Sequence, residues 1–336
     1  MVVAVIGAGP AGASLAWCLA KRGIAVVVYD KAHFPRPKAC GEGLLPPGVA
    51  ALREMGLEPP GFPQVRGLRF VAPSGESVEA DFPEGHGLVV HRERFDAWLV
   101  SMAREAGAEV HEGTQAPEDL EADVVVAADG LHSRFAEGEP DAPRRIGFST
   151  HAKGIDVGDR VEVRFRPEGE VYLAPCGGVT LVAALMRLDR FRRLGDGDAV
   201  RALVGAVETT SPVLALSPLG RFVPEVVRGN LMLIGDAAGA ADPITGEGMS
   251  LALRSALVAA EAIAKGDLAP YGRWRIEEGD AVRAFGRRLL AMARWADRVI
   301  PRLKRRPEAL AELVEVAVGR RRLRDVRLRT WLKALA

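Results

Sequence analysis

Three glycines near the start of the chain have the spacing that binding a dinucleotide requires. Gly7, Gly9 and Gly12 form the pattern G-x-G-x-x-G, and Pro10 and Ala11 stand between the last two. The first glycine permits a tight turn, the second lets a pyrophosphate approach the backbone, and the third lets a helix pack closely on a strand. The N–H groups at the start of that helix would face the phosphates. The alternative is a glycine-rich turn in an ordinary α/β protein.

The segments around these glycines predict a strand–helix–strand unit. Residues 2–6 are a short apolar run typical of a buried strand, and 13–22 are rich in Ala and Leu without Gly or Pro. A second apolar run, 24–29, ends at Asp30, which is placed to accept a hydrogen bond from a ribose 2′-OH. Because its charge would repel a 2′-phosphate, the site favours FAD or NAD over NADP.

Two later strands end in a similar turn. Residues 123–128 are a buried strand that leads into Asp129-Gly130, and residues 230–234 lead into Gly235-Asp236. In an open α/β sheet, ligands bind outside the carboxyl ends of the strands. We therefore expect the three strand ends to line one long crevice.

The composition is that of an ordinary globular protein. The 336 residues are 48% hydrophobic and 26% charged, with a net charge of +1, so no overall field attracts nucleic acid. The sequence has no apolar run of about 18 residues, so we predict no membrane span. The first strand leaves no room for a signal peptide, so we expect a cytoplasmic protein. The 3 cysteines do not suggest a disulfide framework, and we predict no metal site. Scarce amides and abundant Arg fit a thermophile or a GC-rich genome.

The middle of the chain and its end have other patterns. Residues 67–90 alternate apolar and polar side chains around a Pro-Ser-Gly turn, which predicts an antiparallel hairpin, and 160–186 hold further strands. Residues 320–335 interleave arginines with apolar side chains, a basic amphipathic pattern. That pattern suits a terminal helix packed on the body, or a contact with a membrane surface or partner.

The motifs at the strand ends resemble those of a known family. ADGLHS (128–133) is similar to the Asp-Gly fingerprint of the class A flavoprotein monooxygenases, the p-hydroxybenzoate hydroxylase-like superfamily, and GDAAGAADPITGEGMSLAL (235–253) to their Gly-Asp fingerprint. The segments DPITGEGM and RPKACGEGLLP most resemble the geranylgeranyl reductase branch of that superfamily.

The resemblance implies a fold and its division into domains. It predicts an α/β chain (α+β overall) with a Rossmann-like FAD-binding domain on a parallel sheet, an inserted, mainly antiparallel β substrate domain, and C-terminal helices. We expect the FAD-binding domain to comprise 1–66, 91–145 and 226–300, the substrate domain 67–90 and 146–225, and the basic C-terminal helices 301–336.

The resemblance also implies contacts with FAD. Arg92 would lie near the pyrophosphate, Asp236 would hydrogen-bond the ribityl chain, and Pro243 would lie against the flavin; the alternative for Arg92 is a surface charge at a helix start. The N–H groups of the helix that begins near 247 would stabilise negative charge on the reduced ring. The full set expected at the cofactor is Gly7, Gly9, Pro10, Ala11, Gly12, Asp30, Lys31, Arg92, Asp129, Gly130, Gly235, Asp236, Pro243, Gly246, Glu247, Gly248 and Met249.

A Pro- and Gly-dense loop after Asp30 contains a second group of candidates. By resemblance, Cys40, Gly41 and Glu42 would approach the flavin pocket, and Cys176 would reach it from the other domain. Glycines beside a cysteine suit close approach to a ligand. The alternatives are a surface loop with solvated charges and, for Cys176, a turn residue.

The sequence departs from the family pattern in ways that bear on the electron donor. The family usually has an Arg after the Asp-Gly fingerprint, but Ala136 stands at that position here. There is also no second G-x-G-x-x-G after a strand. A separate NAD(P)H domain is therefore not expected, and the reductant would be transiently docked NAD(P)H or a protein donor.

The leading hypothesis is an FAD-dependent reductase that transfers hydride from reduced flavin to C=C bonds of an isoprenoid or other lipophilic molecule. The first alternative is an NAD(P)H-dependent monooxygenase of a small or aromatic molecule, and the second is a non-enzymatic flavin redox module. An NAD-only dehydrogenase is disfavoured by the two later fingerprints. The basic C-terminus would suit a peripheral contact with a membrane.

Overall fold

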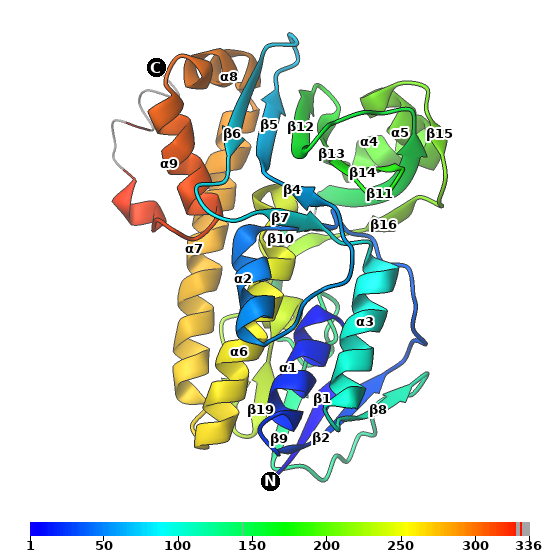
Figure 1. The fold of residues 1–336 in the computed structure, drawn as a ribbon, viewed down its shortest axis with the longest axis vertical. Helices are drawn as coiled ribbons and strands as arrows, with labels where there is room; N and C mark the ends of the chain where they lie inside the picture. The colour runs from blue at the N-terminus through cyan, green and yellow to red at the C-terminus, as the bar shows by residue number, and fades with distance from the viewer. Residues whose placement is uncertain (143, 327–329, 331–336) are drawn as a thin grey trace.

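The fold was analysed in a computed structural model that describes residues 1–142, 144–326 and 330. Figure 1 shows a parallel sheet with its helices in the lower half and a larger sheet in the upper half, with the long helix α7 (Ala269–Ala293) running beside both. The expected α/β class, with parallel and antiparallel sheets, is confirmed.

The lower sheet has the strand order β18-β19-β9-β1-β2-β8. All neighbours are parallel except β18 and β19. The strands are β1 (Val2–Ile6), β2 (Ala25–Asp30), β8 (Glu109–Glu112), β9 (Val124–Ala127), β18 (Val227–Arg228) and β19 (Leu231–Leu233). Their covering helices are α1 (Pro10–Ala20), α2 (Pro46–Glu54), α3 (Arg92–Glu105) and α6 (Gly248–Lys265). The apolar runs form the buried core between these layers.

The larger sheet has the order β15-β11-β14-β13-β12-β5-β6, with β16 paired to β11. The predicted hairpin is confirmed as β5 and β6, and β5 also pairs in parallel with β12. The strands are β5 (Gly67–Val71), β6 (Ser77–Asp81), β11 (Arg145–Lys153), β12 (Arg160–Arg166), β13 (Gly169–Pro175), β14 (Thr180–Arg187), β15 (Glu208–Thr209) and β16 (Leu214–Leu216). Two helices, α4 (Leu188–Leu194) and α5 (Asp196–Val204), follow β14.

Small elements join the two halves. The strand β7 (Gly87–Val89) pairs with β3 (Gly43–Leu44) and β4 (Gln64–Val65), not with the larger sheet as the expected boundary at residue 90 implies. The reason is local, because Val90 also donates its N–H to the carbonyl of Glu42 at 2.8 Å. A second link is the pair of β10 (Glu139–Ala142) and β17 (Leu219–Phe222). Two 3₁₀ turns are η1 (Gly235–Ala238) and η2 (Pro243–Thr245).

The C-terminal helices cover the hairpin. The helices α8 (Ala296–Lys304) and α9 (Pro307–Ala317) share a buried apolar cluster with Val78 and Phe82 of the β6 segment. Gly319, at φ +68°, follows the end of α9, and within residues 320–326 the one helical element is a 3₁₀ turn, η3 (Leu323–Asp325). The expectation of helix over the basic stretch is therefore wrong for 320–326, and Arg327–Arg329 and 331–336 lie outside the described residues. Among the helices that are described, none is long and apolar enough to cross a membrane.

Candidate functional site

The first glycine-rich turn has the geometry of a phosphate cradle. A Cβ on Gly7 would overlap the carbonyl of Ala128, and a Cβ on Gly12 would overlap the carbonyl of Gly7, so both positions require glycine. In front of Gly9 there is open space: among the described residues, a Cβ there would meet Arg36 Nη2 alone within 4 Å, at 3.8 Å. No side chain caps the N-terminus of α1 and no acid lies in its first turn. Its N–H groups are thus available to an anion.

Asp30 is fixed at the end of β2 by two backbone hydrogen bonds. Its Oδ2 accepts the N–H of Ala8 at 2.8 Å, and its Oδ1 accepts the N–H of Ala32 at 2.9 Å. Each oxygen keeps a further lone pair, so the carboxylate can still accept from a ribose hydroxyl. The adjacent Lys31 is exposed at the surface.

A group of cations faces this turn. The guanidinium of Arg92 makes two hydrogen bonds to Asp96, at 2.8 and 2.7 Å, and Arg36 lies 3.5 Å from the same carboxylate. Arg92 is 7% exposed, so the surface-charge alternative for it is wrong. The side chain of Lys38 is exposed to solvent, yet the protein around it lowers its pKa, and the positive charges of Arg36 and Arg92 lower the pKa further. Three cations around one buried acid leave positive charge for a pyrophosphate to neutralise.

Asp236 follows the end of β19, in the turn η1. Its side chain is exposed, yet the surrounding protein raises the pKa of its carboxyl, and the charges of Lys38, Arg275 and Arg92 oppose that rise. Arg275 holds the turn by hydrogen bonds to the carbonyls of Gly235, at 3.2 Å, and Gly239.

Asp129-Gly130 lies against the first turn, since a Cβ on Gly7 would touch the Cα of Asp129 at 2.9 Å. The side chain of Asp129 is exposed, and Gly130 has a φ of +84°. The ends of β1 and β9 are thus adjacent, as the strand pattern predicts.

The third fingerprint ends in an uncapped helix start. Asp242 accepts the N–H of Ile244 at 3.0 Å, which fixes the turn η2, and Pro243, Gly246 and Gly248 are exposed beside it. No side chain caps α6, and its first turn has no acid. This N-terminus can therefore stabilise an anion.

Two other residues of this fingerprint are more enclosed. Burial raises the pKa of Glu247 to about 8. The positive charge of Arg254 lowers this pKa, and the negative charge of Glu278 raises it. Met249 is buried in the core of the lower half, so its side chain packs there.

The loop at Cys40 joins the two halves of the molecule. The N–H of Cys40 donates to Ser149 Oγ at 3.3 Å, and a Cβ on Gly41 would lie 3.9 Å from Ala183 Cβ, both on the larger sheet. Glu42 is buried, and the thiol of Cys176 lies 3.6 Å from its Oε2. Burial, and then the charge of Glu42, raises the pKa of Cys176 to about 12. The structure thus brings Cys176 to this loop.

Two histidines here were missed by the sequence analysis. His151 Nε2 lies 3.0 Å from Glu42 Oε2, and the His91 ring stacks on the His151 ring, with centroids 4.8 Å apart and an interplanar angle of 15°. Ligand atoms of the three residues lie within 4.8 Å of one another. Stacked rings direct their in-plane lone pairs side by side, not to one point, so we interpret the group as a hydrogen-bonded Glu42–His151 pair with His91 stacked on it. The buried Nδ1 of His91 has no hydrogen-bond partner among the described residues. No motif links positions 42, 91 and 151, which only folding brings together.

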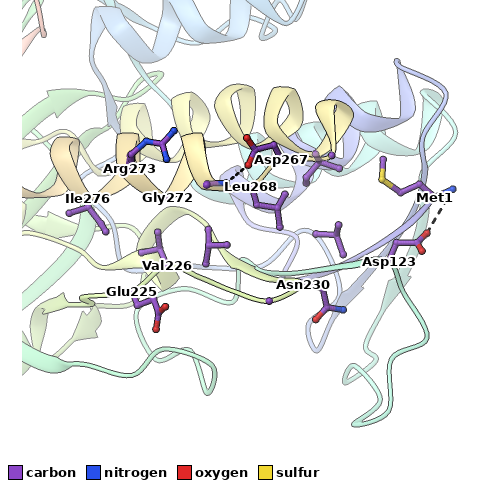
Figure 2. A pocket seen from close by; sticks show the side chains of 16 residues that line it. Met1, Asp123, Glu225, Val226, Asn230, Asp267, Leu268, Gly272, Arg273 and Ile276 are labelled. Carbon is purple, nitrogen blue, oxygen red and sulfur yellow. Dashed lines mark hydrogen bonds and ion pairs between the residues drawn. The ribbon is translucent and has the colours of Figure 1, made fainter.

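A hollow of about 640 Å³ lies elsewhere (Figure 2). Met1, Asp123 and Asn230 line it, at the N-terminal ends of the parallel strands, together with Leu268 and Arg273 at the start of α7. The three fingerprints follow the carboxyl ends of those strands, so this hollow is separate from the candidate site.

Residues 1–118 match the family model described as FAD binding domain. Together with the phosphate cradle and the cations Arg36, Lys38 and Arg92, this match makes the chain a flavoprotein with FAD as its cofactor. The residues present fit that group, because open glycine positions and uncapped helix starts meet a surplus of positive charge.

The chain is similar to named reductases. It is 30% identical to digeranylgeranylglycerophospholipid reductase 1 of Methanopyrus kandleri, over 88% of this chain and 86% of the relative. It is 31% identical to a menaquinone reductase of Mycolicibacterium smegmatis, over 80% of this chain and 78% of the relative. The chain belongs to the geranylgeranyl reductase branch of the class A flavoprotein superfamily, and it is an FAD-dependent oxidoreductase whose relatives at 30% identity or more, given above, are named as reductases.

Solved structures share the fold. The flavin-dependent brominase Bmp2 matches with a TM-score of 0.79 at 19% identity, over 95% of this chain and 94% of that one. A geranylgeranyl bacteriochlorophyll reductase-like protein of Thermoplasma acidophilum matches with a TM-score of 0.65 at 23% identity, over 99% and 95% of the two chains.

Proposed function

We propose that this flavoprotein reduces C=C bonds of a polyprenyl or similarly lipophilic substrate. The observation that carries the proposal is where the candidate flavin-binding segments meet the larger sheet. The backbone N–H of Cys40 donates a hydrogen bond to Ser149 Oγ, and Gly41 lies close to Ala183. Asp242 Oδ2 lies 2.9 Å from Arg145 Nε. Arg145 and Ser149 share one face of β11, and Ser149 pairs with Ala183 on β14.

The same face of the sheet also carries apolar side chains. Leu181, Ala183, Phe165 and Tyr172 belong to one hydrophobic cluster with residues of α7 and α8, beside the buried ion pair of Arg145 and Glu170. Apolar side chains of this kind would favour an apolar substrate, because removing its chain from water contributes about 25 cal/mol per Å² buried. The names of the relatives, which refer to prenylated lipids and to menaquinone, agree with a substrate of this kind.

The roles proposed for the residues follow the two halves of the cofactor. Gly7, Gly9, Gly12 and Asp30 hold the ADP half, and Arg36, Lys38 and Arg92 neutralise the pyrophosphate. Asp236 binds the ribityl chain, Pro243 lies against the ring, and the start of α6 stabilises charge on it. When bound, FAD supplies the hydride chemistry.

The electron donor is proposed to be NAD(P)H bound transiently, or a redox protein. Ala136, at the position where the family usually has an Arg, is buried. The nearby Arg134 donates to the carbonyl of Ala116 at 3.5 Å and lies over the ring of Phe135, 4.9 Å from its centroid. Anaerobic mixing of the FAD-loaded protein with NADH or NADPH measures direct reduction by either. Bleaching of the flavin by one of them identifies it as a competent donor, and no bleaching favours a protein donor.

A peripheral membrane contact through the basic C-terminus is proposed as well. In the described part, Arg320 pairs with Glu84 at 2.9 Å and Arg321 with Glu315 at 2.8 Å, so these arginines are partly neutralised. Co-flotation with vesicles containing anionic lipid, lost at high salt, would support the contact. No binding at low salt would contradict it.

The reductase function is tested by anaerobic reoxidation. The FAD-loaded protein is reduced with dithionite, freed of excess reductant, and mixed with menaquinone or a geranylgeranyl lipid. We expect return of the oxidised-flavin spectrum together with a product that has gained two hydrogen atoms. Absence of reoxidation by all lipophilic probes, together with substrate-stimulated oxygen use, would replace this function by the monooxygenase alternative.

A further inference from the structure

A strained turn holds the buried carboxylate of Glu42. Within the described residues, Glu42 is the one non-glycine residue with positive φ, at +50°. The N–H of Gly43 donates to the carbonyl of Gly41 at 2.5 Å and closes a three-residue turn around it. Such turns are rare and cost free energy, and strained residues of this kind cluster at functional sites. The strain directs a carboxylate that is only 4% exposed into the protein.

A chain of hydrogen bonds connects this carboxylate to the surface. Glu42 Oε2 lies 3.0 Å from His151 Nε2, and His151 Nδ1 lies 3.1 Å from Ser211 Oγ. Ser211 is half-buried and follows the exposed strand β15. Both ring nitrogens of His151 thus have polar partners, and an imidazole can accept a proton on one nitrogen while it releases one from the other.

Other polar groups fix the chain in place. Ser211 Oγ accepts the N–H of His151 at 2.9 Å, and the carbonyl of Ser211 accepts from Thr150 Oγ1 at 2.7 Å. Glu42 Oε1 accepts the N–H of Arg92 at 3.0 Å. The titratable or charged groups that face the chain are His91, Cys40, Cys176, Arg92 with Asp96 behind it, and Arg94.

We propose that Glu42, His151 and Ser211 form a proton relay between solvent and the place where the reduced cofactor meets its substrate. This inference rests on the proposed function. Reduction of a C=C bond breaks the π bond and forms two C–H bonds, one from hydride and one from a proton. Reduced FAD, when bound, would supply the hydride, which carries both electrons. The proton leaves the inner end of the relay at Glu42, and solvent replaces it through Ser211 and His151.

The position of the inner end supports this role. Glu42 follows Gly41, which approaches Ala183 on the larger sheet, and it lies in the loop that by resemblance reaches the flavin. The Cys176 thiol beside it stays protonated at neutral pH, because its pKa is about 12. Glu42 and His151 are therefore the pair through which the proton passes.

The relay is tested first without substrate. The FAD-loaded full chain is photoreduced in weakly buffered solution, and a pH-indicator dye follows proton uptake while absorbance follows the flavin. In the wild type we expect uptake to keep pace with reduction. In Glu42→Gln and His151→Phe we expect uptake to lag by tenfold or more, consistent with the ~10²-fold scale of positioned proton transfer. Uptake at the wild-type pace in both variants would overturn the relay.

A matched control exists in the same chain. His111 Nε2 lies 2.7 Å from Glu109 and its ring stacks on Tyr29, so it is a histidine–glutamate pair at the surface, away from the loop at Cys40. We expect His111→Phe to take up protons at the wild-type pace. If His151→Phe does not fold, as judged by FAD content and melting temperature, Ser211→Ala interrupts the outer end of the relay and is expected to give the same lag.

A second measurement separates the relay from the proposed function. With a geranylgeranyl lipid as probe, His151→Gly should lose turnover and recover it with added imidazole, and its pH profile should differ from that of the wild type. Turnover in this variant equal to the wild type, without a change in pH profile, overturns the relay. If proton uptake lags in the variants as expected, but the wild type turns over no lipophilic probe, the relay is supported and the proposed substrate class is overturned.

Discussion

A Cβ on Gly12 would overlap the carbonyl oxygen of Gly7, five residues earlier. This contact fixes the distance between α1 and the end of β1, and it therefore fixes the phosphate cradle. Gly9, between them, faces open space. Two glycines of one motif are thus required for different reasons, one for packing inside the protein and one for room for the ligand.

Gly12→Ala is expected to destabilise the protein by about 1–3 kcal/mol, as overpacking does, and to lose FAD. Gly9→Ala should keep its melting temperature without FAD and lose FAD affinity only. Thermal melts of the apoprotein and flavin titration distinguish the two. Gly197→Ala, in α5 with no atom near its Cβ, serves as control. Equal loss of apoprotein stability in Gly9→Ala and Gly12→Ala would contradict this division.

Asp30→Ala should weaken FAD binding and leave most of the fold intact. The substitution removes the acceptor for the N–H groups of Ala8 and Ala32 and for the ribose hydroxyl. Loss of one such charged acceptor corresponds to about 1.5–3 kcal/mol, or roughly tenfold to 150-fold in Kd. Fluorescence titration with FAD measures it. An unchanged Kd would mean that Asp30 only shapes the loop.

Arg92→Met should be strongly destabilising, because it removes both hydrogen bonds to the completely buried Asp96 and leaves Arg36, at 3.5 Å, as its remaining ion-pair partner in the described part of the chain. Breaking a buried ion pair costs about 3–5 kcal/mol. Arg187→Met is the control, since Arg187 pairs with Asp189 at the exposed surface, and we expect it to leave stability essentially unchanged. Denaturant titration measures both. A small effect of Arg92→Met would show that water reaches Asp96.

The stability of the apoprotein should depend on Glu247 in a defined pH range. The pKa of this carboxyl is about 8 in the folded chain and about 4.5 when it is unfolded. Between these values the unfolded state releases the proton that the folded state keeps, so folding loses stability as the pH rises from 4.5 to 8. Glu247→Gln removes this loss. The variant should gain stability over the wild type across that range, by up to a few kcal/mol at pH 8. Parallel stability curves for the two proteins would contradict the raised pKa.

The sequence alone determined the elements whose structure follows from a local sequence pattern. The strands at 2–6, 24–29 and 123–128 are continuous apolar runs, and burial on both faces of a parallel sheet requires such runs. The glycine spacing and Asp30 could be interpreted because their roles depend on backbone conformation within one βαβ unit. The fingerprints at Asp129 and Asp236 indicated the cofactor by resemblance, before any contact was known.

Only the tertiary structure decided which distant residues meet. It buried Arg92 against Asp96, joined β7 to the loop at Gly43, and ended α9 at the left-handed Gly319. It also brought His151 to Glu42, 109 positions earlier in the chain. Periodicity reports which face of an element is buried, but not which element covers it. Contacts between segments depend on how two sheets and the loops between them pack, so the phosphate cradle was predictable and the histidine–glutamate network was not.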